Sequence, residues 1–213
     1  MNIEIWEKMM EIEGRKEHSY AAATYKDLPT LREIEKILNE KLQAEHPCDR
    51  DTLVDSIFAV RFLGSAYESM WRIAYAVKYY KWLLELQVDL YTRFQEHDKQ
   101  CADDYYTALR ARNYYTADDC ADLVELAKKL LSDNKRKQTE IQVFEHFHPL
   151  KHDPVELTDE YLGVIDEVEK IMDEKEAKKL HPFTQAELFQ ALLCERGVEW
   201  KSLMELNPGI HFD

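Results

Sequence analysis

The stretch AVRFLGSAYESMWRIAYAVKYYKWLLEL, which runs from Ala59 to Leu86, decides the fold of this 213-residue chain. It lies in a strongly apolar region, from Thr52 to about His97, whose apolar residues recur at helical spacing. Gly64 and Ala76 carry small side chains, which let two helix backbones approach closely. We therefore expect two consecutive, tightly packed helices here, forming the central core.

Five positions in this stretch follow a repeat pattern: Leu63, Gly64 and Tyr67 in the first expected helix, and Ala76 and Tyr80 in the second. On these residues the region from about 56 to 89 resembles one tetratricopeptide repeat, a helix-turn-helix unit of about 34 residues. Trp71 stands where the turn of that family usually has glycine. The resemblance implies that the first helix of the pair lines a concave binding surface.

The composition also favours helices. Only five glycines occur in the chain, too few for the many turns with positive φ that a β-sandwich or barrel requires. A single repeat unit cannot bury both of its faces, so neighbouring helix pairs must cover it. We expect an all-α chain of about eight to ten helices, arranged either as an irregular α-solenoid or as an ordinary helical bundle.

The stretch HPLKHDP, residues 148–154, contains two prolines and ends the regular helical pattern. We expect a main helical domain over residues 1–148, which contains the repeat-like pair. Residues 155–213 are predicted to form C-terminal helices and a capping helical hairpin, packed on the first part. The segment from Ala186 to Ile210 is similar to the helical half of a LysM module, and we interpret it as an αα-hairpin without a glycan site.

Local signals predict several helix boundaries. Thr30 with Glu33, and Thr184 with Glu187, have the spacing of capping boxes at helix starts. The basic run NKRKQ, residues 134–138, is interpreted as a solvated link before a helix that covers Gln138 to Phe147.

The charge of the chain excludes one broad class of function. With 42 acidic and 28 basic residues, the formal net charge is −14, which is unlike a generic basic nucleic-acid binder.

No stretch has the roughly 18 to 20 apolar residues that cross a bilayer, and the N-terminus lacks the features of a secretory signal. We therefore expect an acidic, cytoplasmic protein with no membrane partner. Its scattered cysteines are expected to be reduced; they are Cys48, Cys101, Cys120 and Cys194.

Signatures of several enzyme classes are missing from the sequence, including GxSxG, GxxxxGK and the dinucleotide-binding glycine pattern. Adjacent carboxylates occur at Asp103 and Asp104, and again at Asp118 and Asp119. Both pairs stand at expected helix starts, where aspartate accepts backbone N–H bonds and complements the helix dipole. We interpret them as helix caps and expect no catalytic residue.

A group of histidines could gather around a metal ion, since zinc accepts imidazole nitrogens. These are His146, His148 and His152. The group has no established ligand spacing, and we interpret it as a helix C-terminus enriched in histidine, where a partial positive charge complements the helix dipole. We predict no metal site and no cofactor, while metal binding by these histidines stays open.

These observations favour a non-enzymatic scaffold or adaptor that binds a protein or peptide in a helical groove. If the repeat resemblance holds, four residues of its first helix face that groove: Phe58, Arg61, Ser65 and Glu68. Ser65 replaces the asparagine of the carboxylate-clamp versions of the family, so recognition of an acidic C-terminus is not expected. No direct contact with nucleic acid is expected, and the oligomeric state stays open.

Two alternatives remain. An acidic inhibitor could occupy a nucleic-acid-binding surface of its target by imitating phosphate charge, which the net charge of −14 permits. A metal-dependent helical enzyme is the third possibility, and stoichiometric metal in the purified protein would support it.

Overall fold

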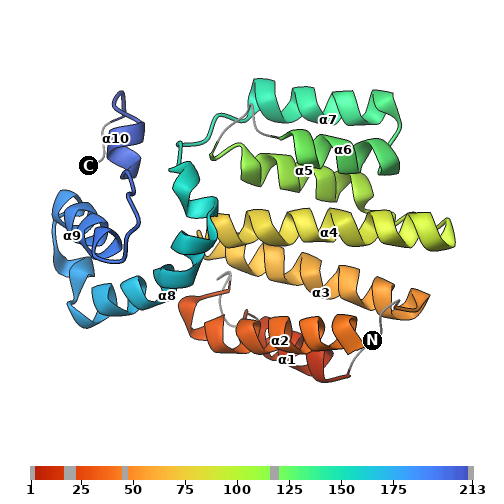
Figure 1. Ribbon diagram of the computed structural model, residues 1–213, viewed down its shortest axis with the longest axis horizontal. Helices are drawn as coiled ribbons and strands as arrows, with labels where there is room; N and C mark the ends of the chain where they lie inside the picture. The colour runs from red at the N-terminus through yellow and green to blue at the C-terminus, as the bar shows by residue number, and fades with distance from the viewer. Residues whose placement is uncertain (1–2, 17–22, 45–47, 116–119, 211–213) are drawn as a thin grey trace. The chain divides into compact units, whose positions relative to one another are not determined.

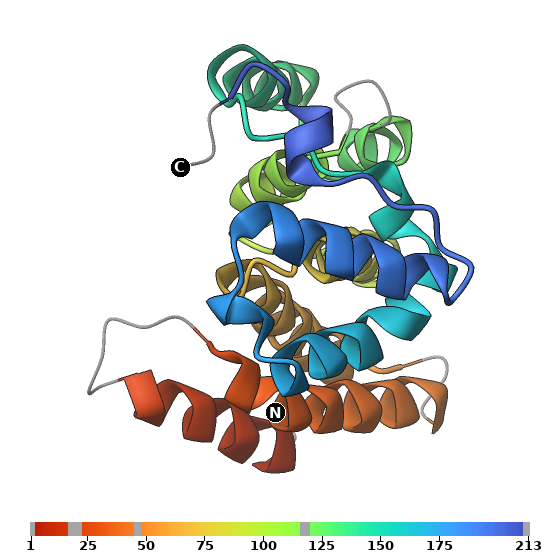
Figure 2. The ribbon, with the colours of Figure 1, turned by 90° about the vertical axis from the view of Figure 1, so that its left-hand side faces the viewer.

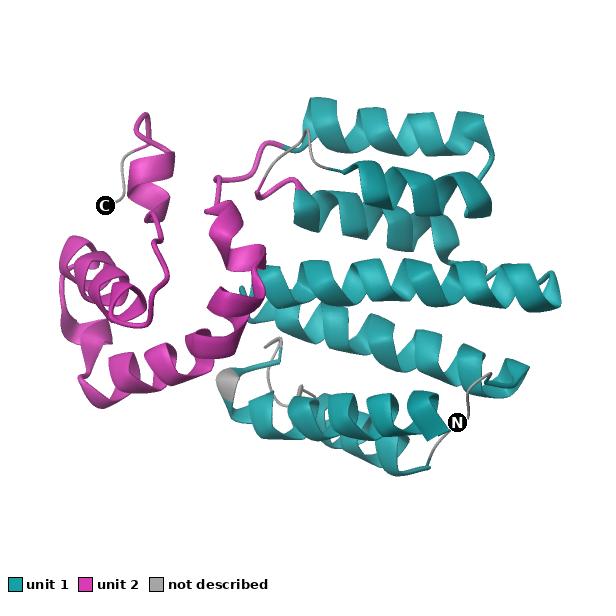
Figure 3. Ribbon diagram, viewed as in Figure 1, with its two compact units in different colours: residues 1–112, 118–147 teal, residues 113–117, 148–213 magenta. Residues whose placement is uncertain are grey.

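The structure is a computed structural model that describes residues 3–16, 23–44, 48–115 and 120–210. Over these residues it contains ten α-helices, three short 3₁₀ helices and no strand, which confirms the all-α prediction (Figure 1). The chain divides into two compact units (Figure 3). Unit 1 comprises residues 1–112 and 118–147, and unit 2 comprises residues 113–117 and 148–213.

Unit 1 contains seven of the described α-helices. Their bounds are α1 Ile3–Lys16, α2 Leu28–Ala44, α3 Arg50–Ser69, α4 Ile73–Phe94, α5 Cys101–Arg112, α6 Ala121–Leu130 and α7 Asp133–His146. A 3₁₀ helix, Tyr25–Asp27, leads directly into α2. Figures 1 and 2 show α1 and α2 side by side at one end of this unit, with α7 at the opposite end.

The α3–α4 hairpin forms the centre of unit 1, as the sequence predicts. The side chain of Asp49 caps α3 by accepting a hydrogen bond from the backbone N–H of Thr52. The two helices are separated by a turn at Trp71, whose backbone has a positive φ of 61°. Gly64 packs so closely on α4 that an added Cβ would lie 2.6 Å from Cε1 of Tyr80. The small residue therefore permits the close approach of these helices, and Ala76 of α4 is fully buried.

Consecutive helices of unit 1 can be taken in pairs, α1 with α2, α3 with α4 and α5 with α6, but α5 and α6 each pack more extensively on α4 than on each other. Side-chain contacts also join the first helices of successive pairs, from Trp6 to Phe58 and from Arg61 to Asp104. Equivalent contacts join the second helices, where Lys78 of α4 pairs with Glu35 of α2 and Lys81 pairs with Asp122 of α6. α7 packs chiefly on α5. The seven described helices of unit 1 form a helical bundle, with α3 and α4 in the most extensive contact.

Unit 2 contains α8 Asp159–Glu174, α9 Pro182–Cys194 and the short α10 Leu203–Leu206, with 3₁₀ helices at Pro154–Leu157 and Ala177–Lys179. Its centre includes the buried carboxylate of Glu156. This group accepts hydrogen bonds from the Tyr115 hydroxyl at 3.0 Å and from Trp200 Nε1 at 2.8 Å, and it lies 3.1 Å from His152 Nδ1. Three partners therefore compensate for the removal of one charge from water.

Both expected capping boxes are wrong. α2 begins at Leu28, so Thr30 lies inside its first turn. α9 begins at Pro182, whose fixed φ suits the first helical position, and His181 occupies the capping position before it. A capping box is present instead between Ser202 and Glu205 at the start of α10.

The basic run of residues 134–138 is also not a link between helices. It forms the first turns of α7, because the Ser132 side chain caps this helix by accepting from the backbone N–H of Lys135. Arg136 is buried and pairs with Glu140 at 2.6 Å, so a charge expected in water belongs to the core. Asp118 and Asp119 lie outside the described residues.

Candidate protein-docking surface

One face of α1 is apolar yet exposed. Ile3, Trp6 and Met10 follow each other at intervals of three and four residues, which places them on the same side of the helix. The core-facing side of α1 is supplied by Ile5, Met9 and Ile12, all of which are buried. α1 is therefore apolar on two sides, and only one of them is covered by unit 1.

Two apolar side chains of α3 extend this exposed area. Val54 and Phe58 lie one turn apart, and the Phe58 ring lies 6.2 Å from the Trp6 ring, centroid to centroid. Exposed fractions in this group range from 38% at Val54 to 73% at Ile3. We call it the α1–α3 surface, and it consists of Ile3, Trp6, Met10, Val54 and Phe58.

Carboxylates accompany the α1–α3 surface. Glu7 directly follows Trp6, and Glu13 lies one turn beyond Met10, so both project from the exposed side of α1. Neither residue forms an ion pair with a residue in the part of the chain that the structure describes. At the start of α3, Asp51 is exposed and pairs with Arg50 at 2.8 Å. The surroundings of the apolar area are therefore negatively charged along α1.

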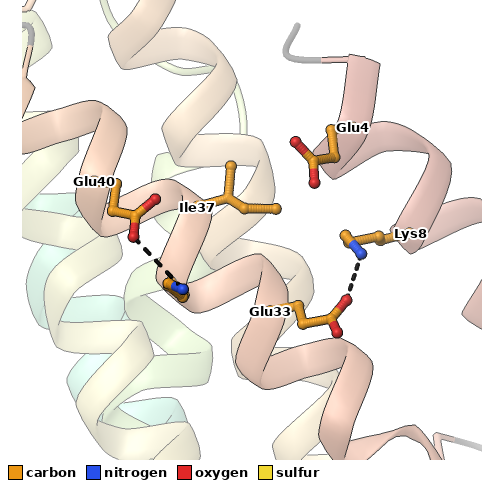
Figure 4. A pocket seen from close by; sticks show the side chains of 6 residues that line it. Glu4, Lys8, Glu33, Ile37 and Glu40 are labelled. Atoms are coloured by element: carbon orange, nitrogen blue, oxygen red, sulfur yellow. Dashed lines mark hydrogen bonds and ion pairs between the residues drawn. The ribbon is translucent and has the colours of Figure 1, made fainter.

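The opposite flank of α1 faces α2 across a cleft of about 470 Å³ (Figure 4). Its walls are almost entirely charged. Lys8 forms an ion pair with Glu33 across the cleft, and Lys36 pairs with Glu40 at 3.9 Å along α2. Ile37 is the apolar side chain among the six that line it. Because its lysines already have acidic partners, this cleft offers less to a ligand than the α1–α3 surface does.

The structure separates the four residues expected to line a groove. Phe58 is part of the α1–α3 surface, and Ser65 is exposed two turns further along the same side of α3. Arg61 and Glu68 lie on the flank of α3 that faces α5, where both charged groups have partners inside unit 1.

Arg61 takes part in a network that reaches α5. Its Nε and one terminal nitrogen donate to the Asp104 carboxylate at 2.9 and 2.7 Å, and that terminal nitrogen also lies 3.0 Å from Asp98. Burial alone would lower the pKa of Arg61, but the hydrogen bonds and charges of Asp104 and Asp98 outweigh it and raise the pKa. Gln87 donates a further hydrogen bond to Asp104 at 2.6 Å. Arg61 is thus a structural cation in this network.

Glu68 is engaged in the same way. It pairs with Arg110 of α5 and accepts a hydrogen bond from the Tyr80 hydroxyl at 2.7 Å. Burial, followed by the charge of Glu68, raises the pKa of Tyr80. A partner that recruited Glu68 would have to replace both internal contacts.

The prediction that Asp103 and Asp104 are both helix caps is wrong for Asp104. Asp103 and Asp104 both lie in the first turn of α5, and Asp103 is exposed, as a residue near a helix start usually is. The Asp104 side chain is buried and serves as the acceptor for Arg61 and Gln87. Its principal contacts come from α3 and α4, which local spacing does not reveal.

Four residues of the surface are not among those predicted from the sequence: Ile3, Trp6, Met10 and Val54. A signal was available in WEKMM, residues 6–10, because apolar side chains occur on two sides of one short helix. A surface helix normally needs only one apolar stripe, so a second stripe indicates a second contact.

Unit 2 has a separate cleft of about 510 Å³ beside Trp200. Its lining includes the exposed Cys194 together with Asp153, Glu199 and Glu205. Two of these carboxylates have local structural roles: Asp153 accepts from the backbone N–H of Lys201 at 2.6 Å, and Glu205 belongs to the capping box of α10.

The histidine group is not assembled as a metal site in the structure. Across the described ranges, no group of three or more His, Cys, Asp or Glu side chains is placed to hold a metal ion. His152 is directed to Glu156, and its ring also contacts the rings of Tyr114 and Tyr115 edge-on.

Among the helices described, none has both the length and the apolar character that crossing a membrane requires. In comparisons with known proteins, the chain matches no family model, no curated protein and no solved structure.

Proposed function

We propose that this chain is a non-enzymatic scaffold that binds a protein or peptide on the α1–α3 surface. The observation that carries the proposal is the contact between the exposed Trp6 and Phe58 rings, which merges the apolar faces of two helices into one area. Contiguous exposed apolar patches on a folded protein frequently mark interaction sites. Aromatic residues and methionine are also enriched in the buried centres of interfaces.

The arrangement of helices supports the same function. Successive helix pairs in unit 1 resemble the layout of tetratricopeptide repeats, in which the first helices of the pairs share the binding face. α1 and α3 are the first helices of their pairs, and the α1–α3 surface spans both of them. We regard unit 1 as an irregular relative of such arrays, with longer helices than a unit of about 34 residues provides.

The free cysteines support a reducing compartment, the cytoplasm, as the place of binding.

Substitution of Phe58 by aspartate tests the proposal. A carboxylate in the middle of the contact must be desolvated when a partner docks, so binding should be lost while folding is kept. Ile141→Asp is the matched control, because Ile141 is similarly exposed on α7, away from this surface. Proteins that co-purify with the wild type and with Ile141→Asp, but not with Phe58→Asp, would be partners of the α1–α3 surface.

Equal recovery of every partner by the two variants would contradict the proposal. The salt dependence of the binding affinity distinguishes the proposed apolar docking from imitation of nucleic-acid charge. A partner held by apolar side chains should retain most of its affinity in high salt, whereas a steep decline would favour an acidic inhibitor.

A further inference from the structure

We infer that the occupant of the α1–α3 surface is an amphipathic helix with lysine or arginine beside its apolar stripe. The inference rests on the proposed function and specifies the chemistry of the partner. It follows from three properties of the surface: how binding groups are presented, how far the apolar area extends, and which charges accompany it.

The first property concerns the backbone. α1 and α3 are helices, so the N–H and C=O groups along their middles are used in hydrogen bonds within each helix. A partner in extended conformation gains much of its affinity by pairing with an open sheet edge, and this surface has no such edge. Recognition must therefore come from side chains, as it does when a helix lies on other helices.

The second property is the length of the apolar area. Ile3 and Met10 are seven residues apart, which corresponds to about 10 Å along α1, or two helical turns. Val54 and Phe58 add one turn on α3, and Trp6 contacts Phe58 between the two rows. A partner helix with apolar side chains at positions i, i+3 or i+4, and i+7 presents a stripe of the same length.

The third property is charge. Glu7 and Glu13 are exposed on the side of α1 that carries Trp6 and Met10. The whole chain adds a formal charge of −14, which attracts a cationic partner over a longer range. A second copy of this chain would bring the same carboxylates against each other, and the repulsion disfavours a symmetric dimer through this surface.

A displayed library of random 16-residue peptides provides the test, with the full-length protein as the target. Peptides are selected for binding to the wild type and then measured on Phe58→Asp, and on Ile141→Asp as its control. We expect peptides that lose binding to Phe58→Asp alone. Their sequences should show helical apolar spacing and an excess of lysine and arginine over the unselected library.

Charge reversal tests the electrostatic part separately. The double variant Glu7→Lys with Glu13→Lys should weaken binding of the selected peptides about tenfold. The control is Glu125→Lys with Glu145→Lys, which changes the net charge equally at exposed positions of α6 and α7 within the same unit. It should change the affinity less than twofold.

The outcomes distinguish the inference from the proposed function. Phe58-dependent peptides that are neutral or acidic, lack helical spacing, or ignore the charge reversal on α1 would overturn the inference and leave the proposed function standing. Selected peptides that bind Phe58→Asp as well as the wild type would overturn both, as would a selection without any Phe58-dependent peptide.

Discussion

Gly64 and Gly163 are both glycines inside helices, but they have opposite surroundings. A Cβ at Gly64 would meet the Tyr80 ring at 2.6 Å, and this ring is buried with its hydroxyl bonded to Glu68. A Cβ at Gly163 would meet nothing within 4 Å. The same substitution should therefore have opposite effects at the two positions.

Gly64→Ala should destabilise the protein by about 1–2 kcal/mol, because the destabilisation from overpacking against Tyr80 exceeds the stabilisation from the higher helix propensity of alanine. Gly163→Ala should stabilise it by about 0.5–1 kcal/mol. Urea unfolding of both variants measures these free energies. A stabilising effect of Gly64→Ala would show that α3 and α4 are not in close contact at this point.

Asp104 and Asp103 offer a second matched pair. Asp104→Ala would leave the partly buried Arg61 with Asp98 alone and would remove the acceptor of Gln87. Removal of one partner of a buried ion pair costs about 3–5 kcal/mol. Asp103→Ala should cost only about 0.3–1 kcal/mol, since it removes an exposed charge near a helix N-terminus.

Chemical denaturation of the two aspartate variants decides whether position 104 is a core residue or a cap. Equal losses of stability would mean that both residues only cap the N-terminus of α5, as the sequence predicts.

These residues show where inference from sequence ends. The partners of Arg61 and Glu68 lie 43 and 42 positions further along the chain, so both side chains looked free to meet a ligand. Phe58 lies on an exposed face of α3, which depends only on the spacing within that helix. Its contact with Trp6 depends on how α1 packs in unit 1, which no local pattern contains.

At the scale of elements, long helices were easier to predict than their ends. The apolar periodicity of α3 and α4 extends over many turns, so it identified the central hairpin. A helix start depends on competition among a few neighbouring residues. α9 begins at Pro182 rather than near Thr184, and α7 begins directly after Ser132 rather than after the basic run.

The turn between α3 and α4 contains backbone strain. Trp71 has φ of 61°, a conformation that costs an L-residue about 1 kcal/mol and that glycine adopts freely. The side chain is 72% exposed, so its removal sacrifices little burial. Trp71→Gly should therefore stabilise the protein by about 1 kcal/mol.

Trp71→Ala is the control for the loss of the indole, because alanine keeps the Cβ and the strain. Thermal unfolding of both variants should place Trp71→Gly above Trp71→Ala in midpoint temperature. Identical midpoints would assign the effect to the side chain rather than to the backbone.

At the scale of the whole molecule, the four cysteines differ in exposure, so their reactivity measures how tightly the chain is packed. Cys194 is exposed, whereas Cys48, Cys101 and Cys120 are buried. Burial and the neighbouring carboxylates of Asp104 and Asp98 raise the pKa of Cys101 to about 12, so mild alkali will not generate its thiolate. Titration with a thiol reagent should label one cysteine in the native protein and all four in denaturant.

Cys194→Ser should abolish the labelling of the native protein. Rapid reaction of a second thiol in that variant would show that a buried cysteine becomes accessible by local opening, and mass spectrometry of the labelled peptides would identify it.

The path of the chain between the two units has a consequence for any cut in the backbone. Residues 113–115 belong to unit 2 and hold the later segment through Lys151 to Asn113, His152 to Tyr114 and Tyr115 to Glu156. A protease that hydrolyses the peptide bond after Phe147 would leave these bonds intact. The two fragments should then migrate together on a native gel and come apart only in detergent or urea, so a clean band on a denaturing gel would be no sign that the C-terminal piece had been released.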